Sequence, residues 1–599
     1  MKEKVMEKDI SFTQYIKSHF LPVLFDAVNT HLEKTSHDSL QDLEVRTVYV
    51  EDVPFMQLNF DVVVVAKLVM GENLFDSWLR ISCTGDLEKQ LEDFHILSVS
   101  VYQGKASYQK PLSDTLLPYL HRDQLDELAS GIIKQYYPEA LLTSQVLDAM
   151  KFAQNLGLDI KMRKLSKAGT TFGETIFTDT KVKIYDKISD CMVEEEIKGG
   201  TILIDPSHYL TRNYGAVNNT IVHECVHWLL HRKAFTLARL FQPKMRFLRS
   251  SFSNKTTLDW IEWQANTLSP RLQMPLVHFK KKVDELQGIY HYLNGEQSNL
   301  IGEMIYVIDN LSNFYHVSKM AAKIRLLNVG FEGARGIYKY VDGHYVQPYV
   351  FERGVLSQTQ TFAIPLEETI RQSTTNKDLQ EKLKTGNYLY VDSHFCLNDP
   401  KYLQTNKFGR LELTEYARLH IEECCLIFEL VVQDKKASTC FDEVLYRDVN
   451  QEIRFEAHFI NKKNMDEKYL IRNRMIELQE LAISLPGSFS GTVSKLIEWS
   501  ELTLSKVEEQ SLISERTLYR MRTDENYNVS LELIIQLCIG LHLPPEISTI
   551  LISRSSKRLG NMELHFLYRF LLNCCYTRSI YECNDILKAQ GFSRLGKES

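Results

Sequence analysis

Alternating and continuous apolar runs in the first part of the chain predict β-strands at residues 45–50, 60–66 and 96–102. Ahead of them, residues 11–33 space their apolar side chains as one face of a helix does. We therefore predict a small α+β domain over residues 1–120. None of its patterns suggests catalysis, so recognition of a substrate or partner is the default expectation for this domain.

A different pattern follows, in which a short buried strand at residues 200–205 precedes an apolar helix at residues 218–230. The helix carries the sequence HECVH from His223 to His227. Residues four apart lie on one helical face, so both imidazoles can reach one metal ion. Glu224 would stand beside a water on that metal, which makes the motif the minimal apparatus of a zinc-dependent peptide-bond hydrolase.

A catalytic zinc takes three protein ligands and keeps one position for water, so the motif needs a third ligand. His231 lies one more turn along the helix, where its imidazole rotates away from the common centre, and we disfavour it. A second helical segment, residues 258–275, offers two carboxylates, Asp259 and Glu262. Their positions alone leave both open as the third ligand, and an Ala-Asn pair follows Glu262 three residues later.

Together these features resemble a known family. The strand, the HExxH helix, the sequence Glu-x-x-Ala-Asn that begins at Glu262 and the closing Met-Pro pair are similar to those of the ImmA/IrrE metallo-endopeptidases. These are bacterial zinc enzymes that cleave helix-turn-helix repressors. A helix at residues 142–158, a strand at 159–162 and closing helices around 314–330 add to the resemblance, which implies a zincin-like peptidase domain over residues 121–330.

The resemblance also implies roles for single residues. His223, His227 and Glu262 would bind one catalytic zinc, and Glu224 would be the general base that later protonates the leaving amine. A protein substrate follows from the same resemblance, with a repressor of the Xre type as the expected target. The donor that stabilises the oxyanion stays open among three side chains: Tyr209, Tyr214 and His231.

The region from 331 to 485 contains a repeated pattern, since YVDGHYV at residues 340–346 recurs as YVDSHFC at residues 390–396. One interpretation is two strand-turn units in a middle α+β region. The other is a structural zinc site with four ligands: His394, Cys396, His420 and Cys424. The spacing lacks a paired CxxC knuckle, so we favour turns and core packing and expect no second, structural zinc.

The last region, residues 486–599, is patterned as helices throughout and resembles the Cro/C1-type (Xre) helix-turn-helix domains. In that fold Ser514 would cap the recognition helix. The resemblance implies five outward side chains that would contact DNA or a protein partner: Glu515, Arg516, Tyr519, Arg520 and Arg522. Between residues 501 and 560, seven basic side chains stand against eight acidic ones, which is a poor electrostatic match for DNA phosphates.

Length and composition restrict the class of protein. A chain of 599 residues exceeds what one hydrophobic core serves, so we expect an α+β multidomain protein with an all-α C-terminal domain. The charged start and the absence of a long apolar run in the sequence indicate neither a signal peptide nor a membrane span, and predict a cytoplasmic protein. Eleven cysteines, an odd number, fit reduced thiols. A net charge of -7 gives the whole chain no nucleic-acid signature.

Two classes of function therefore compete. One is a cytoplasmic zinc endopeptidase that cleaves a regulatory protein. The other is a DNA-binding transcription regulator that keeps the zincin fold as a sensor or scaffold. The HExxH motif with Glu262 favours the first class, while the identity of its target rests on the resemblance alone.

Overall fold

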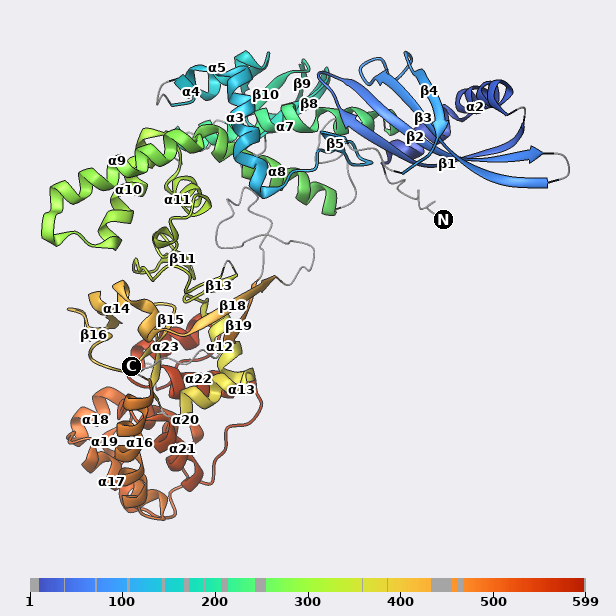
Figure 1. Ribbon diagram of the computed structural model, residues 1–599. Coiled ribbons are helices and arrows are strands. Elements are labelled where there is room, and N and C mark those ends of the chain that lie inside the picture. The colour runs from blue at the N-terminus through green and yellow to red at the C-terminus, as the bar shows by residue number, and fades with distance from the viewer. Residues whose placement is uncertain are drawn as a thin grey trace. The chain divides into compact units, whose positions relative to one another are not determined.

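The computed structural model shows a mixed α+β protein, as the sequence predicts (Figure 1). It describes residues 10–36, 38–70, 73–104, 108–142, 146–165, 172–186, 189–205, 214–242, 255–357, 359–384, 386–432, 455–460 and 467–596. The chain divides into two compact units. The first unit comprises Met1–Ile289, Val307–Val329 and Val444–Gln451, and the second comprises Tyr290–Tyr306, Gly330–Glu443 and Glu452–Ser599.

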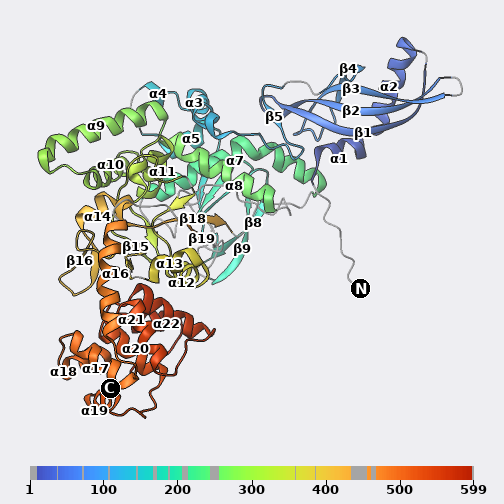
Figure 2. The same cartoon turned by 60° about the horizontal axis from the view of Figure 1, so that its bottom comes forward.

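An antiparallel sheet with two helices against it begins the first unit (Figures 1 and 2). Its strands run in the order β4-β3-β2-β1-β5. They are β1 (Ser39–Asp52), β2 (Gln57–Met70), β3 (Asn73–Asp86), β4 (His95–Val101) and β5 (Pro111–Leu112). The helix predicted at residues 11–33 is in fact two helices, α1 (Phe12–His19) and α2 (Leu21–Thr35). Pro22, in the first turn of α2, supplies no backbone N–H and starts a new helix there.

A second, three-stranded sheet has the order β6-β10-β7. Its central strand, β10, runs parallel to β6 and antiparallel to β7. The strands are β6 (Asp159–Met162), β7 (Gly173–Ile176) and β10 (Thr201–Ile204), and a separate hairpin joins β8 (Thr180–Asp186) to β9 (Cys191–Ile197). The helices of this region are η1 (Arg122–Gln124), α3 (Leu125–Tyr136), α4 (Glu139–Leu142), α5 (Ala149–Asn155), α7 (Tyr214–Phe241) and α8 (Lys255–Gln273). Residues of α3, α5, β10, α7 and α8 share one hydrophobic core.

Helix α7 is longer than the predicted 218–230 because its second half enters the core of the N-terminal sheet. Leu237 is buried among the side chains of α1, α2 and the strands. Lys233, almost fully buried, donates hydrogen bonds from Nζ to Asp52 Oδ1 at 2.5 Å and to the carbonyl of Val53 at 2.6 Å. One helix therefore belongs to two cores.

Three helices follow in the chain: α9 (Leu276–Asn294), α10 (Leu300–Phe314) and α11 (Lys319–Asn328). Arg325 of α11 is fully buried and ties together parts of the first unit that lie far apart in the sequence. Its Nη2 donates to Asp126 Oδ1 of α3 at 2.5 Å, and its Nε donates to the carbonyl of Met274, which follows α8, at 3.0 Å. A buried guanidinium paired in this way fixes α3, α11 and the residue after α8 relative to one another.

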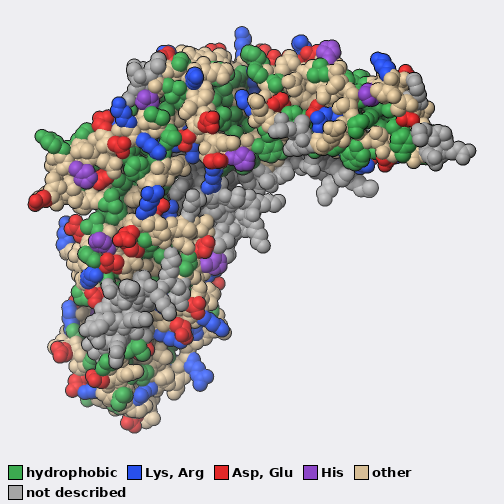
Figure 3. Space-filling view, viewed as in Figure 1, with side chains coloured by type: hydrophobic (Ala, Val, Ile, Leu, Met, Phe, Trp, Pro, Cys, Tyr) green, Lys and Arg blue, Asp and Glu red, His purple; other side chains and the backbone are tan. Residues whose placement is uncertain are grey.

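The surface carries mixed charge, and on the face shown in Figure 3 basic and acidic side chains are interspersed. Within the described ranges, no helix combines the length and the apolar character that crossing a lipid bilayer requires.

The second unit begins with short elements. They are η3 (Gly295–Gln297), η4 (Glu332–Ala334), β11 (Tyr340–Val341), β12 (His344–Tyr345), β13 (Gln360–Thr361), α12 (Leu366–Thr375), α13 (Lys377–Lys384), β14 (Tyr388–Val391), β15 (His394–Leu397), β16 (Leu403–Thr405), β17 (Leu411–Leu413), α14 (Glu415–Leu419), α15 (Ile421–Cys424), β18 (Ile427–Val432) and β19 (Phe455–Ile460). Strands β13, β18 and β19 form an antiparallel sheet, and β16 pairs with β17.

The repeated sequence pattern corresponds to two hairpins, β11–β12 and β14–β15. Each turns through two residues with positive φ, Asp342 and Gly343 in the first hairpin and Asp392 and Ser393 in the second. Left-handed backbone at both central residues is typical of the type I′ turn that matches the twist of a hairpin. The interpretation as two strand-turn units is therefore correct.

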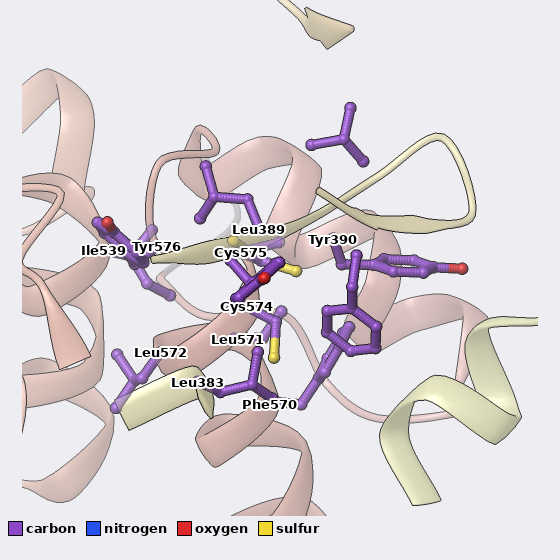
Figure 4. Packing of buried hydrophobic residues seen from close by; sticks show 14 of the residues in the cluster. Leu383, Leu389, Tyr390, Ile539, Phe570, Leu571, Leu572, Cys574, Cys575 and Tyr576 are labelled. Carbon is purple, nitrogen blue, oxygen red and sulfur yellow. The ribbon is translucent and has the colours of Figure 1, made fainter. Parts of the chain in front are cut away.

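Eight helices complete the described part of the second unit. They are α16 (Glu467–Ser484), α17 (Phe489–Trp499), α18 (Leu504–Ser511), α19 (Glu515–Thr523), α20 (Leu531–Gly540), α21 (Pro545–Arg554), α22 (Glu563–Cys574) and α23 (Ile580–Ala589). They share one core with the β14–β15 hairpin, where Leu389 and Tyr390 lie beside Phe570 and Leu571 (Figure 4). Residues on both sides of the predicted boundary at 485 therefore bury their apolar side chains together.

We expect Arg325→Ala to lower the stability of the first unit by about 3 kcal/mol, because it leaves Asp126 and the Met274 carbonyl without this buried partner. Thermal unfolding followed by circular dichroism measures the loss. Lys319→Ala on the same helix removes the exposed pair with Asp309 and is the matched control, with an expected cost below about 1 kcal/mol. Equal melting temperatures for the two variants would contradict the role given to Arg325.

Candidate metal centre

The two histidines of the HExxH sequence and Glu262 meet in the interior of the first unit. His223 and His227 lie on the buried face of α7, 1% and 5% exposed, with their Nε2 atoms 2.9 Å apart. Glu262 comes from α8, and its two carboxylate oxygens lie 3.4 Å from His223 Nε2 and 3.8 Å from His227 Nε2. The three side chains that the sequence predicts as ligands thus converge, with an oxygen of Glu262 within 4 Å of each imidazole Nε2.

The spacing of these atoms suits zinc. Ligand atoms bound to zinc at about 2.0–2.1 Å and at tetrahedral angles stand about 3.3 Å apart. The two Nε2 atoms stand 2.9 Å apart, and the distances from them to separate oxygens of Glu262 are 3.4 and 3.8 Å, so the distances lie on both sides of that value. Two imidazoles and one carboxylate are also the ligand types of a catalytic zinc site with a remaining open position.

Glu224 is held beside the two imidazoles by strand β7. Its carboxylate and the imidazoles of His223 and His227 offer ligand atoms within 4.8 Å of one another. The hydroxyl of Thr175 on β7 lies 2.9 Å from Glu224 Oε2 and 3.0 Å from the backbone carbonyl of Glu224, so it holds this residue against the strand. At Gly173 a Cβ atom would stand 3.2 Å from Glu224 Cγ and 2.6 Å from Thr220 Cγ2, so the strand approaches α7 this closely because glycine occupies that position.

A buried chain of hydrogen bonds runs from a backbone carbonyl to His227. The carbonyl of Pro118 can only accept, so it takes a hydrogen bond from Gln264 Nε2 at 2.8 Å. Gln264 Oε1 then accepts from His231 Nε2 at 2.9 Å. Burial lowers the pKa of His231 to about 3, so its ring is neutral and its Nδ1 accepts from His227 Nδ1 at 2.9 Å.

This polarity fixes the tautomer of His227. With its proton on Nδ1, the lone pair on Nε2 points to His223 and Glu262, as metal binding requires. His231 therefore supports the predicted ligand His227 through a hydrogen bond. Its two ring nitrogens contact His227 and Gln264, so it is not available as the oxyanion donor. Of the other two candidates for that role, Tyr209 and the side chain of Tyr214 lie outside the described residues, as does the side chain of Asp259.

The central and edge strands of the three-stranded sheet differ in what they can offer to an extended peptide. Strand β10 contains most of residues 200–205, but it is paired on both sides and offers no edge to an extended peptide. Strand β7 is the edge strand, and among the described residues no strand pairs with its second edge. The carbonyl of Phe172 accepts a hydrogen bond from the backbone N–H of Asp205. In an antiparallel pair the backbone N–H and C=O groups of successive residues point alternately toward and away from the partner strand. The backbone groups of Gly173 and Thr175 therefore point away from β10.

Sequence reasoning missed Thr175 and Gln264. Thr175 lies in a strand of four residues, too short to show a period. Gln264 is fully buried and lies two residues after Glu262. Its position as a polar residue within the apolar face of α8 is the one sequence signal that could have identified it.

Helix α19 presents most of its predicted contact side chains to solvent. Glu515, Arg516, Tyr519 and Arg520 are exposed, and the guanidinium of Arg520 lies over the ring of Tyr527 at 4.7 Å. Arg522 departs from the expectation of an outward side chain. It is half-buried, and its Nε donates to Ser494 Oγ of α17 at 3.3 Å.

The four residues considered for a structural zinc do not come together as a set. His394 is buried against Tyr349, with its Nδ1 2.5 Å from the carbonyl of Asp392, and the ring of His420 lies tilted against that of Tyr416. Cys396 and Cys424 do meet, and they meet Cys425 rather than a histidine. Hydrogen bonds from the thiols of Cys396 and Cys425 lower the pKa of the Cys424 thiol.

Comparison with models of protein families, with curated proteins and with solved structures finds no match to this chain.

We expect Gly173→Ala to destabilise the first unit by about 1–3 kcal/mol, because the added Cβ overlaps Thr220 and presses on Glu224. Thermal unfolding measures the effect. Gly288→Ala in α9 is the matched control, since no atom lies within 4 Å of its added Cβ and alanine favours a helix over glycine. An equal or higher melting temperature for Gly173→Ala would show that β7 does not pack on α7 in this way.

Proposed function

We propose that this protein is a zinc-dependent endopeptidase. The observation that carries the proposal is the convergence of His223, His227 and Glu262 from two helices, with Glu224 fixed beside them. A structural role for two buried histidines would not require a carboxylate from α8 to meet both of their Nε2 atoms. The set matches the three ligands and one carboxylate base that hydrolytic zinc sites use.

The chemistry divides between the metal and the chain. Zinc, when bound by these three side chains, acidifies a water and polarises the substrate carbonyl. Glu224 accepts the proton of the attacking water and passes it to the leaving amine. Thr175 keeps the carboxylate of Glu224 in place through its hydroxyl, while His231 and Gln264 hold His227 in the tautomer that presents Nε2.

The substrate of such an enzyme would be an extended segment of a protein. The outward backbone groups of Gly173 and Thr175 can form a ladder with a peptide, as exposed sheet edges do with added strands. Thr175 also bonds to Glu224, so a peptide on this edge would run past the proposed base. This geometry supports cleavage within a chain rather than at its end.

The resemblance to the ImmA/IrrE family narrows the proposal further, to a cytoplasmic bacterial enzyme that cleaves a regulatory protein such as an Xre-type repressor. A zincin-like domain accounts for the small sheet with α7 and α8 against it. Helices α18 and α19, joined by three residues and capped at Ser514, support a helix-turn-helix reading of the C-terminal region.

A second function, binding of DNA by a transcription regulator, is favoured by one observation. Arg516, Tyr519 and Arg520 are exposed on α19, the helix that would read a groove. Against it, the carboxylate of Glu508 accepts from the backbone N–H of Glu515 at 3.0 Å, which places two acidic side chains at the start of that helix. Phosphates would be repelled there, so we rank the peptidase first.

The test of the peptidase is Glu224→Gln. We expect peptide cleavage to fall by about 10²–10⁴-fold while bound zinc is retained, because only the proton acceptor is lost. Cleavage is measured on a peptide library by mass spectrometry of new termini, and zinc by elemental analysis. Glu127→Gln, on the exposed first turn of α3, is the control.

Undiminished cleavage by Glu224→Gln would reject the proposed base. The regulator would be favoured by a different result, namely salt-dependent DNA binding that survives Glu224→Gln and disappears in a variant with both Arg516→Ala and Arg520→Ala.

The hydrogen-bond chain behind His227 makes a separate prediction. We expect Gln264→Leu to weaken zinc binding by about 10–100-fold, because His227 then loses the arrangement that fixes its tautomer. Competition with a chelator measures the affinity. Gln273→Leu, equally buried on α8, is the matched control, and equal affinities in the two variants would show that the chain does not act on the metal site.

A further inference from the structure

Three cysteine side chains converge in the core of the second unit, apart from the peptidase site. Cys396 lies on β15, Cys424 is the last residue of α15, and Cys425 follows it. All three are buried, and their sulfurs lie within 4.8 Å of one another, with Cys424 and Cys425 Sγ 3.8 Å apart. The backbones of Cys396 and Cys425 form an antiparallel bridge, so two separate segments bring the sulfurs together.

This convergence differs from the other buried thiols. Cys574 and Cys575 are also consecutive and buried, yet among the described residues no third ligand-type side chain joins them in a comparable group. Apolar packing alone places thiols anywhere in a core and does not require three sulfurs to share one point.

The distances fit a metal ion. Sulfurs bound to one zinc at about 2.3 Å and at tetrahedral angles stand about 3.8 Å apart, which is the separation of the Cys424 and Cys425 sulfurs. Thiolates select the soft ions Zn²⁺ and Cu⁺. Three sulfurs can satisfy Cu⁺, whereas Zn²⁺ takes a fourth ligand.

His394 supplies a candidate for that fourth ligand. It is fully buried two residues before Cys396, and alternate residues of a strand share one face. Its Nδ1 is engaged by the carbonyl of Asp392, while its Nε2 has no hydrogen-bond partner among the residues that the structure describes. His394 lies outside the 4.8 Å group, so its ring would have to move to reach the ion.

We propose that Cys396, Cys424 and Cys425 bind one thiophilic metal ion, Zn²⁺ or Cu⁺, as a structural site. The three thiols release their protons when the ion binds, and no electron is transferred. The ion joins the β14–β15 hairpin to α15 and to the segment before β18, inside the core that the C-terminal helices share. The site is independent of the proposed peptidase centre.

The test uses the full chain with His223→Ala and His227→Ala, which removes the first centre, purified under reducing conditions. We expect about one thiophilic ion per chain by elemental analysis, identified there as zinc or copper. Titration of the metal-free protein with Cd²⁺ should give a thiolate-to-metal charge-transfer band that saturates at one equivalent. Absence of both the retained ion and the band would overturn the proposal, and this measurement does not depend on the folding of a cysteine variant.

Cysteine variants in the same background locate the ion. We expect Cys424→Ser and Cys396→Ser to abolish the charge-transfer band at one equivalent, and Cys574→Ser, the matched control from a consecutive buried pair, to keep it. Retention of the band in Cys424→Ser with native circular dichroism would overturn the assignment. For a zinc site, His394→Ala should weaken the binding of Zn²⁺ by tenfold or more, and unchanged zinc affinity would exclude His394 as the fourth ligand.

Discussion

A buried helix can carry polar side chains only where each of them finds a partner, and this constraint governs α7. Its first half brings His223, Glu224 and His227 into a core, where Glu262, Thr175 and His231 meet them. Its second half brings Lys233 into the core of the N-terminal sheet, where Asp52 and a backbone carbonyl satisfy the ammonium group. Partner side chains are therefore recruited from β1, β7 and α8, and the arrangement of the first unit follows from what one helix must satisfy.

The same constraint fixes the orientation and the tautomer of His227, one of the side chains that would face the metal. The carbonyl of Pro118 sets the orientation of the Gln264 side-chain amide. That amide places the proton of His231 on Nε2, and the free Nδ1 of His231 in turn sets the tautomer of His227. Each link is a neutral hydrogen bond of ordinary length, yet the chain leaves no ambiguity about which nitrogen of His227 faces Glu262. The second half of the same helix packs in the core of the N-terminal sheet, so α7 is held at both ends by buried side chains.

The second unit shows how the same sequence signals can be misread. Histidines and cysteines at plausible spacings left a mixed ligand set open as the disfavoured alternative, but His394 and His420 pack against the rings of tyrosines while the cysteines gather without them. Residue spacing along the chain indicates which side chains share a helix or a strand face. Residue spacing does not show which segments will pair with each other in space. The pairing of Cys396 on β15 with Cys425, the residue after α15, is one example. The hairpins were predictable, since two-residue turns are encoded by adjacent residues.

By itself the sequence determined what local geometry can encode. The HExxH helix, the strand at 159–162, the hairpin turns and the helices of the last region follow from periods and spacings within single elements, and the carboxylate at Glu262 follows from the resemblance of its sequence to a family motif. Tertiary structure alone decided that β7 rather than β10 is the edge strand, that Thr175 and Gln264 hold the site, and that Cys425 completes the thiol group. The physical reason is that these outcomes depend on how segments distant in the chain pair and pack. The need to give buried polar groups a partner selects that packing, and the periodicity within a single segment does not reveal it.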